Sequence, residues 1–342
     1  MSQPSLDTIV PLLTSFSSLE VERGFALLKE AASPAIYEKL LEGLKLPQVQ
    51  KSWRLDSFHL SPCLACETED QKALARLAVM RATMEAEVSS PALDSYRSVL
   101  GSIKKLVLHM PSLFQDLSAL RCLSQVEWLF LQGQSIMDFS FLSSLEKLHF
   151  LELYECGFVE DLEMLGQNKN LQGLRLTHCK NLQDISALSR LPSLTELDLD
   201  NCPQVQGYEA SGSLTHLRVL WINHIRAADT SALCDLSWAA SLANLETLAL
   251  KYCDGLRDIS GIAGLARLTS LELTGCSVLE EFEALHHLPA LKKLTIASCK
   301  HLANRDFLRD LHGLESLSIS ECGALNDVSS LSGLSEWRKL GW

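Results

Sequence analysis

Seven of the 11 cysteines of this 342-residue chain stand at regular intervals between residues 156 and 322. The interval is 23 residues at every step except one of 51, which equals 23 plus 28. A fixed period of this length means that one structural unit is copied along the chain. We therefore expect these cysteines to fill equivalent structural places and not to form a catalytic or disulfide-bonded set. They are Cys156, Cys179, Cys202, Cys253, Cys276, Cys299 and Cys322.

A leucine pattern precedes each cysteine and identifies the unit. It is Leu-x-x-Leu-x-x-Leu-x-Leu-x-x-Cys, as between Leu191 and Cys202. The Leu-x-Leu step predicts a short strand that sends both leucines inward and the middle residue outward. One coil cannot bury its leucines alone, so stacked neighbours must form the core. Unit starts at residues 100, 123, 145, 168, 191, 214, 242, 265, 288, 311 and 334 predict an α/β solenoid of about eleven 23-residue repeats.

A second repeated element follows the cysteine, as in Asp184-Ile-Ser and Asp258-Ile-Ser. Aspartate before a short helical turn accepts hydrogen bonds from backbone N–H groups, so we expect a capped turn on the convex side. The complete string resembles the internalin-type leucine-rich repeat class and its cysteine-bearing relatives in bacteria and trypanosomatid parasites. The resemblance covers about residues 100–342 and implies a horseshoe with a parallel sheet on its concave side.

The cysteine itself takes the place where the internalin pattern has asparagine. A thiol is smaller and donates a weaker hydrogen bond, but it fits the same buried pocket. The alternative is a row of reactive or metal-binding thiols. We expect the structural role.

The first hundred residues lack the repeat and form, we expect, a helical capping domain over residues 1–95, followed by the repeat domain over 96–342. Apolar residues recur at helical spacing over residues 5–16 and 18–31. Ser33-Pro34 opens a third helix, with proline at its first position, and the capping box that starts at Thr68 opens a fourth, to about residue 87. A domain of this length exceeds what a cap requires, so a binding role is the alternative.

The one metal-like cluster is His59, Cys63 and Cys66. A structural zinc site needs four ligands, and this cluster supplies three. A thioredoxin-like site would need a strand before the cysteine pair and a helix starting at it. We therefore expect no metal and no cofactor, with these residues as a weak candidate.

The outward residues of the strands form the candidate binding surface, because the concave sheet is the usual contact face of this class. From the unit at 123 to the unit at 242, aromatic side chains stand among charges, a composition typical of binding hot spots. The alternative is that scattered exposed aromatics have no function. The 28-residue unit adjoins this zone, and we expect its five extra residues near 237–241. The candidate residues are Phe130, Glu152, Tyr154, Arg175, His178, Asp198, Asp200, Trp221, His224 and Tyr252.

Function follows from the repeat and from what the sequence lacks. No phosphate-binding loop, nucleophile elbow or His-Glu-x-x-His string occurs, so we expect a non-catalytic scaffold or recognition module that binds a protein. The alternatives are a regulatory subunit whose helical N-terminus docks on an enzyme, and an enzyme or metal site hidden in the N-terminal region.

The partner and the compartment are constrained by charge and hydropathy. A net charge of −12 disfavours nucleic acid. No apolar run approaches the length of ~20 residues that a membrane span needs, and we see no secretory signal. Many lone thiols indicate the cytoplasm. An uncapped C-terminal edge bearing Trp337 and Trp342 offers a route to self-association.

Overall fold

The computed structural model describes residues 4–13, 18–31, 33–42, 44–45, 53–54, 59–60, 90–109, 117–224, 233–302, 306–309, 311 and 313–322. The chain divides into two compact units, residues 1–159 and 160–342.

Helices open the first unit, as the apolar spacing predicts. They are α1 (Leu6–Leu13), α2 (Ser18–Ala31), α3 (Pro34–Glu42) and α5 (Pro91–Gly101). The first three confirm the predicted helices, and α3 begins at its proline. Helix α5 was not predicted, although Ser90-Pro91 repeats the signal of Ser33-Pro34. The predicted helix over 68–87 lies outside the described residues. None of the helices in the described ranges is long and apolar enough to cross a membrane.

The strands of the first unit form two sheets. Strands β1 (Leu44–Lys45) and β3 (His59–Leu60) pair antiparallel. Strand β2 (Trp53–Arg54) pairs parallel with β4 (Lys105–His109), which continues to β5 (Trp128–Gln132) and β6 (Phe150–Tyr154). Two residues of the predicted capping domain thus belong to the parallel sheet. The domain boundary at residue 95 stays a prediction.

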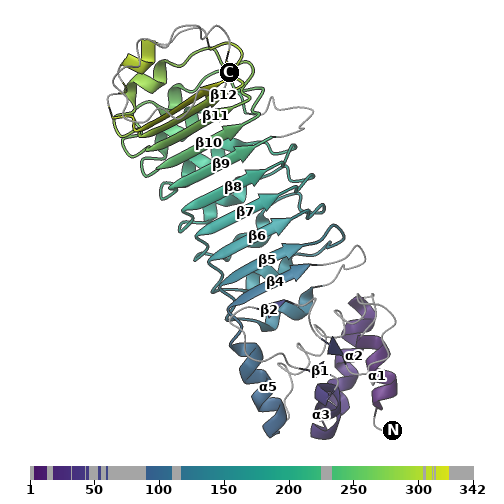
Figure 1. Cartoon of the computed structure of the whole chain (residues 1–342). Helices are drawn as coiled ribbons and strands as arrows, with labels where there is room; N and C mark the ends of the chain where they lie inside the picture. Colours follow the sequence, from purple (N-terminus) through teal and green to yellow (C-terminus); the bar gives the residue numbers. More distant parts are fainter. Residues whose placement is uncertain are drawn as a thin grey trace. The chain divides into compact units, whose positions relative to one another are not determined.

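Seven parallel strands form the sheet of the second unit, in chain order (Figure 1). Neighbouring strands pair in register, so that equivalent leucines of successive coils lie side by side, as Leu248 and Leu271 do. Strands β4 to β13 number ten, one for each predicted unit from 100 to 311, and they confirm the predicted parallel sheet. The unit at 334 lies outside the described residues, as do Trp337 and Trp342. The seven are β7 (Gly173–Thr177), β8 (Glu196–Asp200), β9 (Val219–Asn223), β10 (Thr247–Lys251), β11 (Ser270–Thr274), β12 (Lys293–Ala297) and β13 (Ser316–Ser320).

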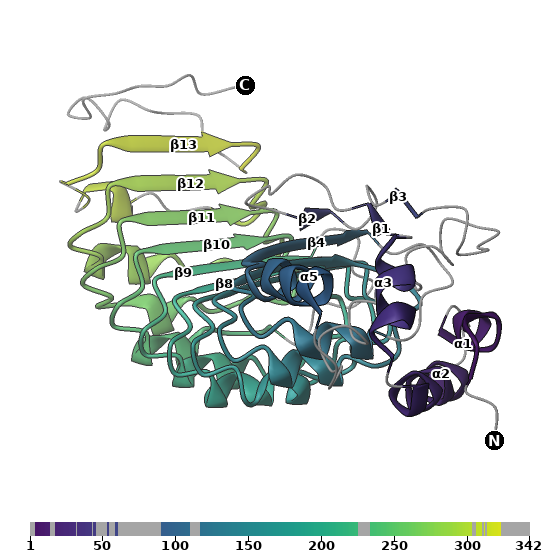
Figure 2. The ribbon, with the colours of Figure 1, turned by 90° about the horizontal axis from the view of Figure 1, so that it is seen from below.

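Short 3₁₀ turns run along the side of the coils opposite the strands (Figure 2). The predicted aspartate caps are confirmed: the Ser186 amide donates to Asp184 Oδ1 at 2.7 Å and the Ser260 amide to Asp258 Oδ1 at 2.6 Å. Between strands and turns, the repeated leucines are almost completely buried. The turns are η2 (Ser118–Cys122), η3 (Ser140–Ser144), η4 (Glu163–Leu165), η5 (Ser186–Arg190), η6 (Tyr208–Ser213), η7 (Ser237–Ser241), η8 (Ser260–Ile262), η9 (Glu283–His287) and η10 (Asp306–Arg309).

The expected position of the five extra residues, near 237–241, is wrong. Those residues form the regular turn η7, whose Ser237 amide donates to Asp235 Oδ1 at 2.8 Å. Asp235 follows the last residue of β9 by 12 positions, whereas Asp258 follows the last residue of β10 by 7. The difference, 12 minus 7, places the extra five residues between β9 and Asp235.

Candidate functional site

The candidate surface is the open face of the sheet, formed by the first, third and fifth residues of each strand. These side chains alternate with buried leucines, and strand β8 is typical, with Leu197 and Leu199 buried between half-exposed or exposed neighbours. The strand period of two therefore decides which residues a partner could contact.

In the second unit, Arg175, Asp198 and Trp221 occupy equivalent third positions on three successive strands. Arg175 Nε donates to Asp198 Oδ2 at 2.9 Å. The same guanidinium lies over the Trp221 ring, 5.9 Å from its centroid. Trp221 is nevertheless 37% exposed. An aromatic side chain is thus presented to solvent while a cation restrains one side of it.

Further hydrogen bonds join coils next to this aromatic residue. Asn223 Nδ2 donates to Asp200 Oδ1 at 2.8 Å. At the adjoining bend, the side chains of Asn201 and His178 meet at 2.6 Å through Nδ2 and Nδ1. These bonds link side chains of neighbouring coils and fix the polar part of the face.

Tyr252 is the second exposed aromatic of this region, at 40% exposure. A Cβ atom on Gly275 of the next coil would come within 2.6 Å of the tyrosine ring. Glycine at this position therefore lets the ring lie against the backbone. Beside it, Lys251 Nζ and Glu272 Oε1 form an ion pair at 2.8 Å. We call Arg175, Asp198, Asp200, Trp221 and Tyr252 the Trp221 surface.

The residue before each cap cysteine forms a sharp bend in left-handed conformation. Six of the seven are not glycine, and their φ angles lie between 52° and 56°. Left-handed backbone is unfavourable for residues with a Cβ atom. At four of these bends the backbone amide donates to a carbonyl of the next coil, as where Tyr252 N donates to Thr274 O at 2.6 Å. The six are Glu155, His178, Asn201, Tyr252, Ser298 and Glu321.

His224 does not belong to the open face, and its placement there was wrong. It is 5% exposed, and its Nε2 lies 3.0 Å from the hydroxyl of Tyr208. In the sequence of this repeat, Ile225 stands where the others have the cap cysteine. His224 therefore stands at the bend position, but its backbone is not left-handed there. Its side chain is consequently buried, and burial lowers the pKa of the His224 imidazole.

In the first unit, the predicted Phe130, Glu152 and Tyr154 lie on the open face of β5 and β6, each partly exposed. Two further aromatics, Trp128 and Phe150, were missed. They pair across these strands as first residues, and Phe150 is 38% exposed. The signal was available, because the residue before the first leucine of Leu-x-Leu also faces outward.

The cap cysteines are buried thiols that donate to strand carbonyls. Cys202 Sγ, for example, lies 3.4 Å from Leu176 O and 3.6 Å from Asp200 O. A hydrogen bond with the neighbouring Cys179 thiol, reinforced by burial, raises the pKa of Cys202 well above its usual value. The same causes, with Cys276 as the neighbour, raise the pKa of Cys299 to about 12. Thiolate chemistry is therefore suppressed at Cys202 and Cys299.

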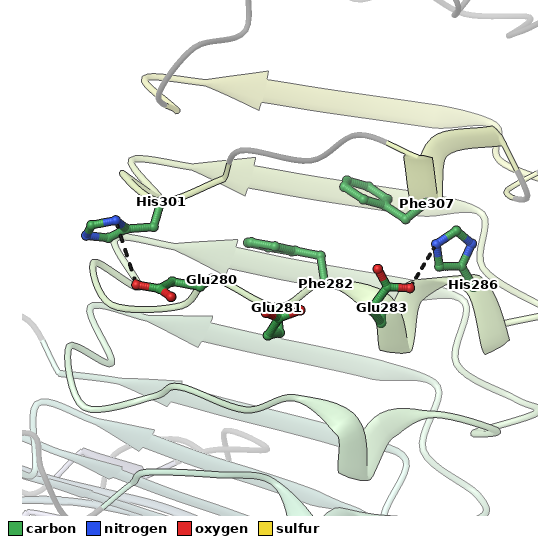
Figure 3. Close-up of a pocket in the computed structure, with 7 residues that line it drawn as sticks. All are labelled: Glu280, Glu281, Phe282, Glu283, His286, His301 and Phe307. Carbon is green, nitrogen blue, oxygen red and sulfur yellow. Dashed lines mark ion pairs between the residues drawn. The ribbon is translucent and has the colours of Figure 1, made fainter.

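A separate hollow of about 390 Å³ lies on the turn side of the second unit (Figure 3). Two pairs of its polar groups lie close together: His286 Nε2 lies 3.4 Å from Glu283 Oε2, and His301 Nδ1 lies 4.0 Å from Glu280 Oε1. Phe282 and Phe307 stack beside them at 5.9 Å. Within the described ranges, no three His, Cys, Asp or Glu residues are arranged to hold a metal ion.

The predicted metal candidate cannot be placed as a cluster. His59 begins β3, while Cys63 and Cys66 lie outside the described residues. The candidate stays a prediction.

Comparison with known proteins identifies the fold. No family model matches the sequence, and no curated protein does. Among solved structures, Toll of Drosophila in complex with Spatzle has a TM-score of 0.54 at 14% identity, over 69% of this chain and 32% of that chain. An internalin (inlF) of Listeria monocytogenes has a TM-score of 0.48 at 21% identity, over 72% and 76%. The likeness to Toll agrees with the repeat and with the ten strands, and this chain therefore folds as a leucine-rich repeat protein.

Proposed function

We propose that this protein is a non-catalytic recognition module that binds a protein partner on the open face of its sheet. The observation that carries the proposal is the Trp221 surface, where Arg175 lies over the exposed Trp221 ring and Gly275 lets the exposed Tyr252 ring lie against the backbone. Tryptophan, tyrosine and arginine supply most of the energy at protein interfaces. Rings that are already restrained lose little conformational entropy on binding, which favours affinity.

The charges on this face suit a protein partner with its own mixed charges. Arg175 pairs with Asp198, and Lys251 pairs with Glu272, so both signs are present next to the aromatic rings. Complementary charges at an interface select the partner and its orientation. Toll, which shares the fold, was solved with the protein Spatzle bound.

Charge and cysteine chemistry support the remaining parts of the proposal. The chain carries a net charge of −12, which favours a partner other than nucleic acid. The nine cysteines in the described part of the chain are all thiols. Thiols in this number favour a reducing compartment, and we propose that the protein is cytoplasmic.

Affinity capture from the source cells with quantitative mass spectrometry tests the proposal. Trp221→Ala and Tyr252→Ala should each reduce recovery of the same partner, by roughly thirtyfold in affinity for a hot-spot loss of about 2 kcal/mol. The matched control is Trp238→Ala, because Trp238 lies on turn η7 away from the strands. A partner recovered equally by wild type and both face variants would refute the proposal.

The second candidate is a regulatory subunit that docks through its N-terminal helices. Leu19 on α2 is 79% exposed, which favours a contact there. If this function is correct, Leu19→Asp should abolish capture of the main partner while Trp221→Ala retains it. Stoichiometric zinc in the purified protein would instead favour a metal site at His59, Cys63 and Cys66.

A further inference from the structure

The column of cap cysteines has one gap, and a buried polar pair lies beside it. Between Cys202 and Cys253, the place of the missing cysteine is taken by Ile225. Tyr208, from turn η6, is 2% exposed, and its ring meets that of His224 edge to face, with centroids 6.1 Å apart. Burial and the nearby thiols of Cys253 and Cys202 raise the pKa of the Tyr208 hydroxyl. The pair thus lies close to both cysteines that flank the gap.

The surroundings of the pair favour a neutral imidazole. From η6, His224 faces the Tyr208 hydroxyl, whose own pKa is raised by burial and by the nearby Cys253 and Cys202 thiols. Toward β10, the His224 backbone amide donates a hydrogen bond to the Lys251 carbonyl at 2.9 Å. Its Nδ1 atom is buried and has no hydrogen-bond partner in the described part of the chain. No carboxylate of the described residues contributes to its pKa, and desolvation is the cause of the shift.

His224 is also joined directly to the Trp221 surface. It is the residue that follows β9, whose third residue is Trp221 and whose last residue, Asn223, donates to Asp200. Because His224 directly follows Asn223, a movement of His224 away from Tyr208 acts on the end of this strand.

We propose that Tyr208 and His224 form a proton-sensitive latch, which holds the end of β9 closed at neutral pH and releases it on acidification. An imidazolium at this place would have one neutral partner and little water, so the opened coil takes up the proton more readily. The latch does not depend on partner binding and goes beyond the proposed function.

The direction of the effect follows from proton linkage. The pKa of His224 is lower in the folded protein than the ordinary value of about 6.5. The open state therefore binds more protons than the closed state below about pH 6.5, and closure weakens as pH falls. One proton taken up on opening changes the opening equilibrium by up to about tenfold for each pH unit.

Hydrogen exchange of the full chain, from about pH 7.5 to about pH 5 and corrected for intrinsic exchange, measures this opening. In wild type, the hydrogen-exchange protection factors of residues 208–224 should fall by up to about tenfold per pH unit below about pH 6.5. The protection factors of strands β11 and β12 should not change. His224→Gln, which cannot take up a proton, should flatten the profile. His216→Gln is the matched control, because His216 is an exposed histidine of the same coil.

Two results would overturn the latch. One is a wild-type protection over residues 208–224 that does not change with pH, and the other is an unchanged pH profile in His224→Gln. If His224→Gln fails to fold, an NMR titration of wild type decides, and a His224 that titrates near the ordinary pKa of about 6.5 refutes the proposal.

Discussion

Gly261 provides a direct test of how closely the coils of the second unit pack. A Cβ atom at this position would lie 1.7 Å from Leu236 O, 2.3 Å from Leu236 C and 2.9 Å from Ser237 Cα. All three obstacles are backbone atoms of the preceding coil, so no side-chain rotation relieves the clash. In Gly261→Ala, turns η7 and η8 must separate.

The cost of that separation follows from these distances. To restore even a tight contact of 3.0 Å, the backbone must move by about 1.3 Å, which is 3.0 minus 1.7. Overpacking of a well-packed core costs about 1–3 kcal/mol, and an obstacle made of backbone belongs at the upper end. The lower entropy of the unfolded chain with alanine returns only about 0.4–1 kcal/mol. We therefore expect Gly261→Ala to destabilise the protein by about 2 kcal/mol.

Urea unfolding followed by circular dichroism measures this change, as a lower midpoint at an unchanged slope. The matched control is Gly157→Ala, since a Cβ on Gly157 would meet nothing closer than Gln134 O at 3.8 Å. That variant should differ from wild type by no more than about 1 kcal/mol. If Gly261→Ala unfolds at the same urea concentration as Gly157→Ala, the argument from coil spacing is wrong.

Two further predictions concern the repeated caps. Asp258→Ala removes the acceptor of the Ser260 amide and of the Ser260 hydroxyl. This variant should lower the free energy of unfolding by about 0.5–2 kcal/mol. Asp258→Asn keeps one acceptor oxygen, so its free energy of unfolding should fall by less. In the native protein, iodoacetamide should label the exposed Cys234 rapidly and the buried Cys276 only after unfolding, because a hydrogen bond with the Cys253 thiol and burial raise the pKa of Cys276. Peptide mass spectrometry checks this, and equal labelling of the two cysteines would contradict it.

Much of the fold was predictable because the period repeats the same local physics in every coil. A leucine two positions from another leucine in a strand must face the same side, which located strands such as β8 and β11 and their in-register pairing. The aspartate caps followed from the chemistry of a side-chain acceptor two residues before an amide. Helix α5 was missed although its Ser90-Pro91 signal was present.

The candidate site was predictable only where residues follow the repeat. Trp221 and Tyr252 occupy ordinary positions of their coils, and both are exposed as expected. Trp128 was missed, because the first position of the strand was not considered. The five extra residues were misplaced, since leucine spacing alone does not distinguish an insertion before η7 from one within it.

The sequence by itself thus determined the period, the inward leucines, the buried thiol column and the outward residues of the strands. These depend on spacing along one strand and on stacking of equivalent positions. Only the tertiary structure decided that His224 is buried against Tyr208, 16 residues earlier in the chain, and that Gly261 lies against Leu236. Both contacts join positions that are not equivalent in the repeat, and they depend on a local φ angle and on coil spacing, which no pattern of residues along the chain specifies.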